Sequence, residues 1–118
     1  MNDYEKALEQ IKKQFPVRRM TQTYAQIELD ILFNAYNYIF IGVLYENNQI
    51  LLTDMAEYAE VCQWEDEDIE DIKKICQQYG VIFNNYNIEC VYRSNQDVKS
   101  YLDCLLALQE KYVEDFKN

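Results

Sequence analysis

The chain has 118 residues, of which 49% are hydrophobic and 27% charged, with only two glycines and one proline. This length suffices for one domain with a buried core, and the scarcity of glycine and proline argues against linkers or low-complexity segments. The formal net charge of −10 disfavours direct binding to nucleic acid or to an anionic membrane. No apolar run approaches the roughly 20 residues of a membrane span, and the first residues lack the pattern of a signal peptide. We therefore expect a single cytoplasmic domain over residues 1–118, without a membrane partner.

Histidine is absent from the chain, and the four cysteines, Cys62, Cys76, Cys90 and Cys104, contain no C-x-x-C pair. Without histidine there is no imidazole metal ligand and no Ser-His or Cys-His nucleophile system. The cysteines lie mostly at apolar positions, which predicts buried free thiols rather than a metal site or disulfides. We therefore expect no cofactor.

The first predicted element is an amphipathic helix over residues 3–14, in which Tyr4, Leu8 and Ile11 recur at helical spacing. Pro16 ends this helix because proline cannot continue a helix across its own position. We interpret the three residues that follow as a short, solvated basic loop.

Three strands with short connections come next. Residues 24–33 alternate between apolar and polar side chains, which predicts a strand with one solvated face. Residues 38–45 are apolar at both even-numbered and odd-numbered positions, which point to opposite faces of a strand. This pattern predicts a central strand that is covered on both faces. Asn47 and Asn48 tolerate positive φ and predict a two-residue hairpin turn before a third strand at residues 49–53.

Helices are predicted for much of the second half of the chain. Asp54 has the position of an N-cap for a helix over residues 55–63, and a second helix is predicted over residues 65–79. Gly80 stands where a left-handed C-terminal cap is expected. The remaining predicted elements are two short strands, at residues 81–83 and 88–92, and a long helix from Ser94 whose apolar stripe runs to Phe116. The order α-βββ-αα-ββ-α indicates an α+β fold, in which an antiparallel sheet (a three-stranded meander plus a hairpin) is packed with N-terminal, middle and long C-terminal helices.

Several of these segments resemble a family known only as domain of unknown function 1828, which is found in bacteria and their phages. The similar pieces are QIELDILF, NYIFIGVLY, ILLTDMAEYAEVC and IKKICQQYGVIFNNYNIECVY, followed by an apolar C-terminal helix. Together they run from about residue 25 to the C-terminus. The usual family run is L-T-D-D-G, whereas this chain has Met55 and Ala56 after Asp54. The resemblance implies a small prokaryotic or phage-type domain and supplies no activity.

Nine acidic residues lie within the eighteen residues from Asp54 to Asp71, with no basic residue among them. Carboxylates three and four residues apart on a helix lie about 5–6 Å from one another at Cβ, a spacing that can imitate the charges of a nucleic-acid backbone. We therefore predict a partner-binding surface made of Glu57, Glu60, Glu65, Asp66, Glu67, Asp68 and Asp71. The alternative is a solvated helix face that only keeps the protein soluble.

The function that these observations favour is a small non-enzymatic interaction protein of phage or mobile-element type. It would bind and inhibit a basic, nucleic-acid-handling bacterial protein, such as a CRISPR effector or a restriction enzyme, by nucleic-acid mimicry. One alternative is a metal-dependent hydrolase or nuclease that uses Asp54 with Glu28 or Asp30 on a neighbouring strand. A homodimer or a larger homo-oligomeric scaffold is a further alternative.

Overall fold

The structure is a computed structural model that describes residues 1–113. Within that range the strands are Val17–Arg19 (β1), Tyr24–Leu32 (β2), Tyr38–Glu46 (β3), Gln49–Thr53 (β4), Ile82–Asn84 (β5) and Asn87–Val91 (β6). The helices are Asp3–Lys12 (α1), Glu57–Cys62 (α2), Ile69–Gln78 (α3) and Asn95–Tyr112 (α4), with a 3-10 turn at Asp66–Asp68 (η1). The predicted α+β class is confirmed, and the predicted elements occur in the predicted order with one added strand, β1. The predicted extension of the last helix to Phe116 lies outside the described residues.

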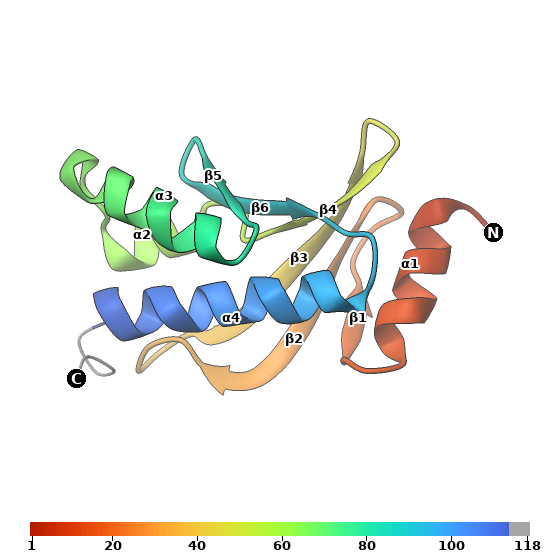
Figure 1. The fold of residues 1–118 in the computed structure, drawn as a ribbon. Helices are drawn as coiled ribbons and strands as arrows, with labels where there is room; N and C mark the ends of the chain where they lie inside the picture. The colour runs from red at the N-terminus through yellow and green to blue at the C-terminus, as the bar shows by residue number, and fades with distance from the viewer. Residues whose placement is uncertain (114–118) are drawn as a thin grey trace.

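All six strands belong to one antiparallel sheet, with the order β1-β2-β3-β4-β6-β5 (Figure 1). The meander of β2, β3 and β4 is the one predicted from the short connections. The β5–β6 hairpin joins it because β6 pairs with β4, with Leu52 opposite Cys90. The two parts that the sequence predicts separately are therefore a single sheet.

The hydrophobic core lies between one face of this sheet and the helices α1, α3 and α4 (Figure 1). Alternate strand positions such as Ile27, Ile41 and Leu52 face this core and are completely buried. The ring of Tyr4 in α1 stacks parallel to that of Tyr45 in β3, with 6.0 Å between the ring centroids. From α4, the buried Tyr101 hydroxyl donates to a backbone carbonyl of β6 at 2.6 Å.

The prediction that β3 is covered on both faces is wrong, because the opposite face of the sheet is not covered by helices. On that face Phe40 and Leu44 are half-buried and Tyr38 is 58% exposed. The even-numbered apolar residues of β3 therefore lie on a sheet face that the helices do not cover (Figure 1).

Two local predictions agree with the backbone. Asn47 and Asn48 have φ values of 53° and 59°, as the hairpin turn requires. Gly80 has a φ of 70°, its N–H donates to the Gln77 carbonyl at 3.2 Å, and the next N–H donates to the Cys76 carbonyl at 3.0 Å. This pair of bonds is the Schellman pattern that ends α3.

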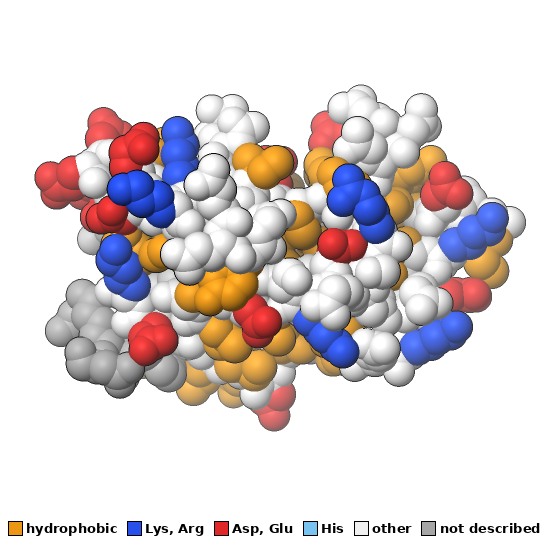
Figure 2. Space-filling model, in the orientation of Figure 1, with side chains coloured by type: hydrophobic (Ala, Val, Ile, Leu, Met, Phe, Trp, Pro, Cys, Tyr) orange, Lys and Arg blue, Asp and Glu red, His pale blue; other side chains and the backbone are white. Residues whose placement is uncertain are grey.

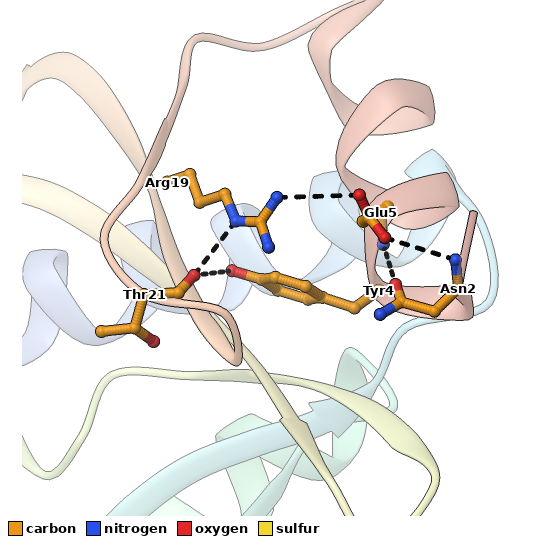
Figure 3. A network of polar contacts seen from close by, with 5 residues as sticks. All are labelled: Asn2, Tyr4, Glu5, Arg19 and Thr21. Atoms are coloured by element: carbon orange, nitrogen blue, oxygen red, sulfur yellow. Dashed lines mark hydrogen bonds and ion pairs between the residues drawn. The ribbon is translucent and has the colours of Figure 1, made fainter.

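The predicted basic loop after Pro16 is instead the edge strand β1, which pairs with residues 25–27 of β2. Side chains of α1 help to hold this edge (Figure 3). The Thr21 carbonyl accepts hydrogen bonds from the Tyr4 hydroxyl at 3.3 Å and from Arg19 Nε at 3.2 Å. Arg19 also pairs with Glu5 at 3.8 Å. These long-range contacts explain why three residues with little strand pattern still form a strand.

All four cysteines are free, with three of them buried and Cys62 half-buried. Two of the buried thiols meet between α3 and α4, where Cys104 Sγ lies 3.7 Å from Cys76 Sγ. The buried positions agree with the predicted packing role.

Candidate partner-binding surface

The acidic segment, residues 54–71, runs from the end of β4 through α2 and η1 into α3. Acidic side chains gather at the end of the molecule where α3 begins, with basic side chains beside them (Figure 2). Of the seven predicted partner-binding residues only Asp68 is half-buried, and the exposed ones are Glu57, Glu60, Glu65, Asp66, Glu67 and Asp71. Most of the predicted surface is therefore accessible.

The helix boundaries in this segment differ from the prediction. Met55 and Ala56 have φ values of 54° and 61°, so the first helix begins only at Glu57. Gln63 has a φ of 52° and ends this helix after Cys62. The acids are thus divided among α2, η1 and α3, and regular α-helical spacing holds only within α2 and within α3.

Three of the predicted acids already have local partners. Asp68 accepts a hydrogen bond from the Glu65 N–H at 2.9 Å, at the start of η1. Asp66 accepts from the Tyr86 hydroxyl at 2.8 Å. Asp71 pairs with Lys111 at 3.7 Å, and both side chains of this pair are about half exposed. These three residues contribute to local structure as well as to the surface.

A second set of acids is exposed, and their carboxylates make no hydrogen bond or ion pair within residues 1–113. Its members are Glu57, Glu60, Glu67 and Glu70. We refer to these four as the unpaired glutamates. Their charges are not neutralised by the fold and remain available to a ligand.

An aromatic cluster packs the middle of the acidic segment against the rest of the fold. The Trp64 ring is 7% exposed and makes edge contacts with Phe83 and Tyr112, each with centroids 5.7 Å apart. Burial, followed by the negative charges of Asp68 and Asp71, raises the pKa of Tyr112 to about 12. The packing of Trp64 against Phe83 and Tyr112 therefore fixes the backbone in the middle of the acidic segment.

Asp54 stands apart from the other acids because it is completely buried. Its carboxylate accepts backbone N–H groups from Ala56 at 3.1 Å, Tyr58 at 3.1 Å and Ile88 at 3.0 Å. The predicted N-cap role is therefore incomplete: Ala56 occupies the cap position, and Asp54 ties the first turn of α2 to the start of β6. Burial raises the pKa of the Asp54 carboxyl, and the three N–H groups oppose that shift.

The structure does not bring Asp54 together with Glu28 or Asp30. Strand register places Leu52, and hence Asp54 two residues later, on the helix-covered face, whereas Glu28 is opposite Phe40 on the open face. Strand β3 also separates β2 from β4. Within residues 1–113 no three His, Cys, Asp or Glu side chains form a group that could hold a metal ion. The predicted hydrolase pair is therefore not formed.

One structural residue of this region was missed by the sequence analysis. The Tyr58 hydroxyl accepts a hydrogen bond from the Phe40 N–H at 3.0 Å and lies 3.3 Å from the Phe40 carbonyl, to which it donates. It thus takes the place of a neighbouring strand at the point where β4 has ended. No local pattern marks this contact, because the two residues are eighteen positions apart.

The fold and this surface define an α+β protein with an open-faced antiparallel sheet and an acidic segment at one end. Comparison of the chain with family models, curated proteins and solved structures gave no match. The resemblance to domain of unknown function 1828 therefore stays a prediction. Among the described residues, no helix has both the length and the apolar character needed to cross a bilayer.

Proposed function

We propose that this protein is a non-enzymatic interaction protein that binds a basic, nucleic-acid-handling partner through its acidic segment and inhibits it. The observation that carries the proposal is the segregation of charge. Nine acids lie between residues 54 and 71 without one base, and the four unpaired glutamates have no partner within the described chain. A cationic groove that normally receives phosphates supplies the complementary charge.

The rigidity of the segment supports binding by a preformed surface. Asp54 fixes the start of the segment through three backbone hydrogen bonds, and Trp64 packs its middle onto Phe83 and Tyr112. A surface that is ordered before binding loses less conformational entropy when the complex forms. The exposed carboxylates then accelerate encounter with a basic partner and place their charges where phosphates would lie.

The proposed setting is the cytoplasm of a bacterium, with a phage or mobile element as the source of the protein. The partner class is a defence effector that grips nucleic acid, such as a CRISPR nuclease or a restriction enzyme. Inhibition follows because the carboxylates and the nucleic acid compete for the same cationic groove.

The test compares two variants with equal changes in net charge. In the first, the unpaired glutamates Glu57, Glu60, Glu67 and Glu70 are replaced by glutamine. In the matched control, four exposed acids outside the segment, Glu9, Asp30, Glu46 and Asp103, are replaced by Gln or Asn. Purified CRISPR nucleases and restriction enzymes are assayed for cleavage of a target plasmid with wild type and with each variant.

Wild type and the control should inhibit one of the nucleases at low salt, and the first variant should lose most of that inhibition. Capture of basic proteins from bacterial lysates, followed by salt elution, extends the same comparison beyond the purified panel. Equal capture and equal inhibition by both variants would reject the acidic segment as the binding surface.

A further inference from the structure

Two thiols lie side by side in the core, at the contact between α3 and α4. Cys104 Sγ is 3.7 Å from Cys76 Sγ, and both residues are completely buried. The other two cysteines, Cys62 and Cys90, make no hydrogen bond to a thiol within residues 1–113. The fold therefore brings together one particular pair of cysteines, which are 28 positions apart in the chain.

Regular helices hold this pair in place. Cys76 lies in the second half of α3, and Cys104 lies in the middle of α4. The backbone of a helix is fixed by its own hydrogen bonds, so each sulfur moves mainly by rotation about its side-chain bonds. A disulfide has an S–S distance of about 2.05 Å, so the two sulfurs need to approach by about 1.7 Å. Side-chain rotation with a small shift of α3 against α4 provides this movement without unfolding either helix.

The hydrogen bond between the two thiols makes them chemically different. The Cys104 S–H donates to Cys76 Sγ. This hydrogen bond lowers the pKa of Cys76, although burial opposes the shift. The same hydrogen bond, followed by burial, raises the pKa of Cys104. Because the thiolate is the nucleophile in thiol oxidation, Cys76 is the thiol that reacts first and Cys104 is the one that completes the disulfide.

We propose that Cys76 and Cys104 are a redox site that forms a reversible disulfide when the protein meets hydrogen peroxide. The Cys76 thiolate attacks one peroxide oxygen, the O–O bond breaks, and the hydroxide that leaves takes up the proton that Cys76 lost, which gives water and a sulfenic acid on Cys76. The Cys104 sulfur then attacks the Cys76 sulfur, the S–O bond breaks, and the hydroxyl leaves as water with the Cys104 proton. Two thiols and one peroxide thus give one disulfide and two waters, and two electrons pass from the sulfurs to the peroxide.

Burial controls the rate of this oxidation. Neither sulfur is exposed, so the oxidant reaches the pair only when α3 opens locally from α4. Hydrogen peroxide is only slightly larger than water, so a partial opening admits it. Once formed, the disulfide links α3 to α4 and restricts the unfolded chain, so the oxidised protein should be more stable than the reduced one. The inference does not rest on the proposed function, since it concerns only the contact between two core helices.

The test uses two variants of the whole chain that each keep two cysteines. Cys62→Ala with Cys90→Ala retains the proposed pair, and the matched control, Cys76→Ala with Cys90→Ala, retains Cys62 and Cys104. Each is treated with hydrogen peroxide, then unfolded and alkylated with a maleimide. The first variant should lose about 2 Da in mass and both alkylation sites, and a dithiol reductant should restore both sites. The control should form no disulfide within the chain.

Wild type gives the same test without any substitution. Proteases that cleave after Glu89 and Arg93 separate the fragments that contain Cys76, Cys90 and Cys104. After peroxide treatment, mass spectrometry should find the Cys76 fragment joined to the Cys104 fragment. This measurement decides the question even if one of the double variants fails to fold.

Thermal unfolding then measures what the disulfide does to the fold. The oxidised Cys62→Ala, Cys90→Ala variant should have a higher midpoint than its reduced form, and hydrogen exchange in α3 should slow. The redox site is rejected if the folded variant keeps both alkylation sites after peroxide treatment, or gains oxygen without forming the disulfide. Equal disulfide formation in the matched control overturns the assignment to this pair. A lower midpoint after oxidation overturns the stabilising link between α3 and α4.

Discussion

Asp54 and the unpaired glutamates are close in the sequence but stand in opposite environments. Asp54 is completely buried and accepts three backbone N–H groups, one of them from Ile88 in a distant strand. The glutamates at positions 57, 60, 67 and 70 are exposed, and their carboxylates make no hydrogen bond or ion pair with the described part of the chain. The same chemical group therefore stabilises the fold in one place and is available for binding in the other.

Burial explains the difference. A buried carboxylate loses its hydration and is tolerated only when protein donors replace the water. An exposed carboxylate keeps its hydration, so it contributes little to folding and can meet a cationic partner at small cost. The comparison predicts that changes at Asp54 act on stability and that changes at the unpaired glutamates act on binding.

The largest effect is expected for Asp54→Ala. Removing the carboxylate leaves three N–H groups without an acceptor, two of them buried, and the loss should be about 3–6 kcal/mol in the free energy of unfolding. Asp54→Asn keeps one acceptor oxygen and should lose about 1–3 kcal/mol. Denaturant unfolding measures both variants, and a loss below about 1 kcal/mol for Asp54→Ala would show that these N–H groups find other acceptors.

Titration of the same carboxyl should also act on stability. Because burial raises its pKa, the folded protein holds the proton more tightly than the unfolded chain does. The resulting stabilisation is present below the unfolded-state pKa of about 3.9 and is lost as the pH rises through the raised folded-state pKa. The stability advantage of wild type over Asp54→Asn should therefore fall across this window and then level off. Unfolding at a series of pH values checks this, and an advantage that grows with pH would mean that the N–H groups outweigh burial.

A smaller loss is expected for Tyr58→Phe. The change removes the hydroxyl that bonds the Phe40 N–H and carbonyl while keeping the ring, which lies 4.1 Å from the Phe33 ring centroid. The free energy of unfolding should fall by about 1–2 kcal/mol. Hydrogen exchange at the Phe40 amide should accelerate more than exchange at Leu44, which pairs with Leu51 of β4 and remains protected. Equal acceleration at both amides would indicate a global rather than a local effect.

A gain in stability is expected for Ala56→Gly. Ala56 has a φ of 61°, a left-handed conformation that costs a residue with a Cβ about 1 kcal/mol relative to glycine. Thermal unfolding should show a higher midpoint, whereas Ala59→Gly inside α2 should lower it. A lower midpoint for Ala56→Gly would mean that the left-handed turn is not strained.

The smallest effect on stability is expected for the unpaired glutamates. Replacing all four by glutamine should change the free energy of unfolding by no more than about 0.5 kcal/mol, because exposed charges contribute little to folding. A loss comparable with that of Asp54→Asn would show that these side chains have a structural role. Thermal unfolding of this variant beside the matched acid control measures the difference.

Local patterns were sufficient to predict much of this fold. The alternation in β2, the Asn47-Asn48 turn and the Gly80 cap depend on neighbours only a few positions away, so their signals are contained in the sequence. Ser94 and Asp97 likewise begin α4 through a capping box.

Asp54 makes contacts that local sequence patterns do not predict. An Asp followed by Glu57 matches a capping box, but the carboxylate also receives the Ile88 N–H from thirty-four positions away. The turn at Met55 and Ala56 is left-handed although neither residue favours that conformation, because Thr53 and Asp54 accept its N–H groups. These long-range and turn-specific hydrogen bonds leave no local pattern in the sequence.

The sequence by itself determined the order of the elements other than β1, the α+β class and the concentration of negative charge in one segment. Only the tertiary structure decided that β1 is a strand and that β6 pairs with β4. It also decided that the helices leave uncovered the sheet face on which the even-numbered residues of β3 lie. The physical reason is the range of the interactions. Turns, caps and periodic burial depend on nearby residues, whereas strand pairing and the covering of a sheet face depend on segments that meet only after the chain has folded.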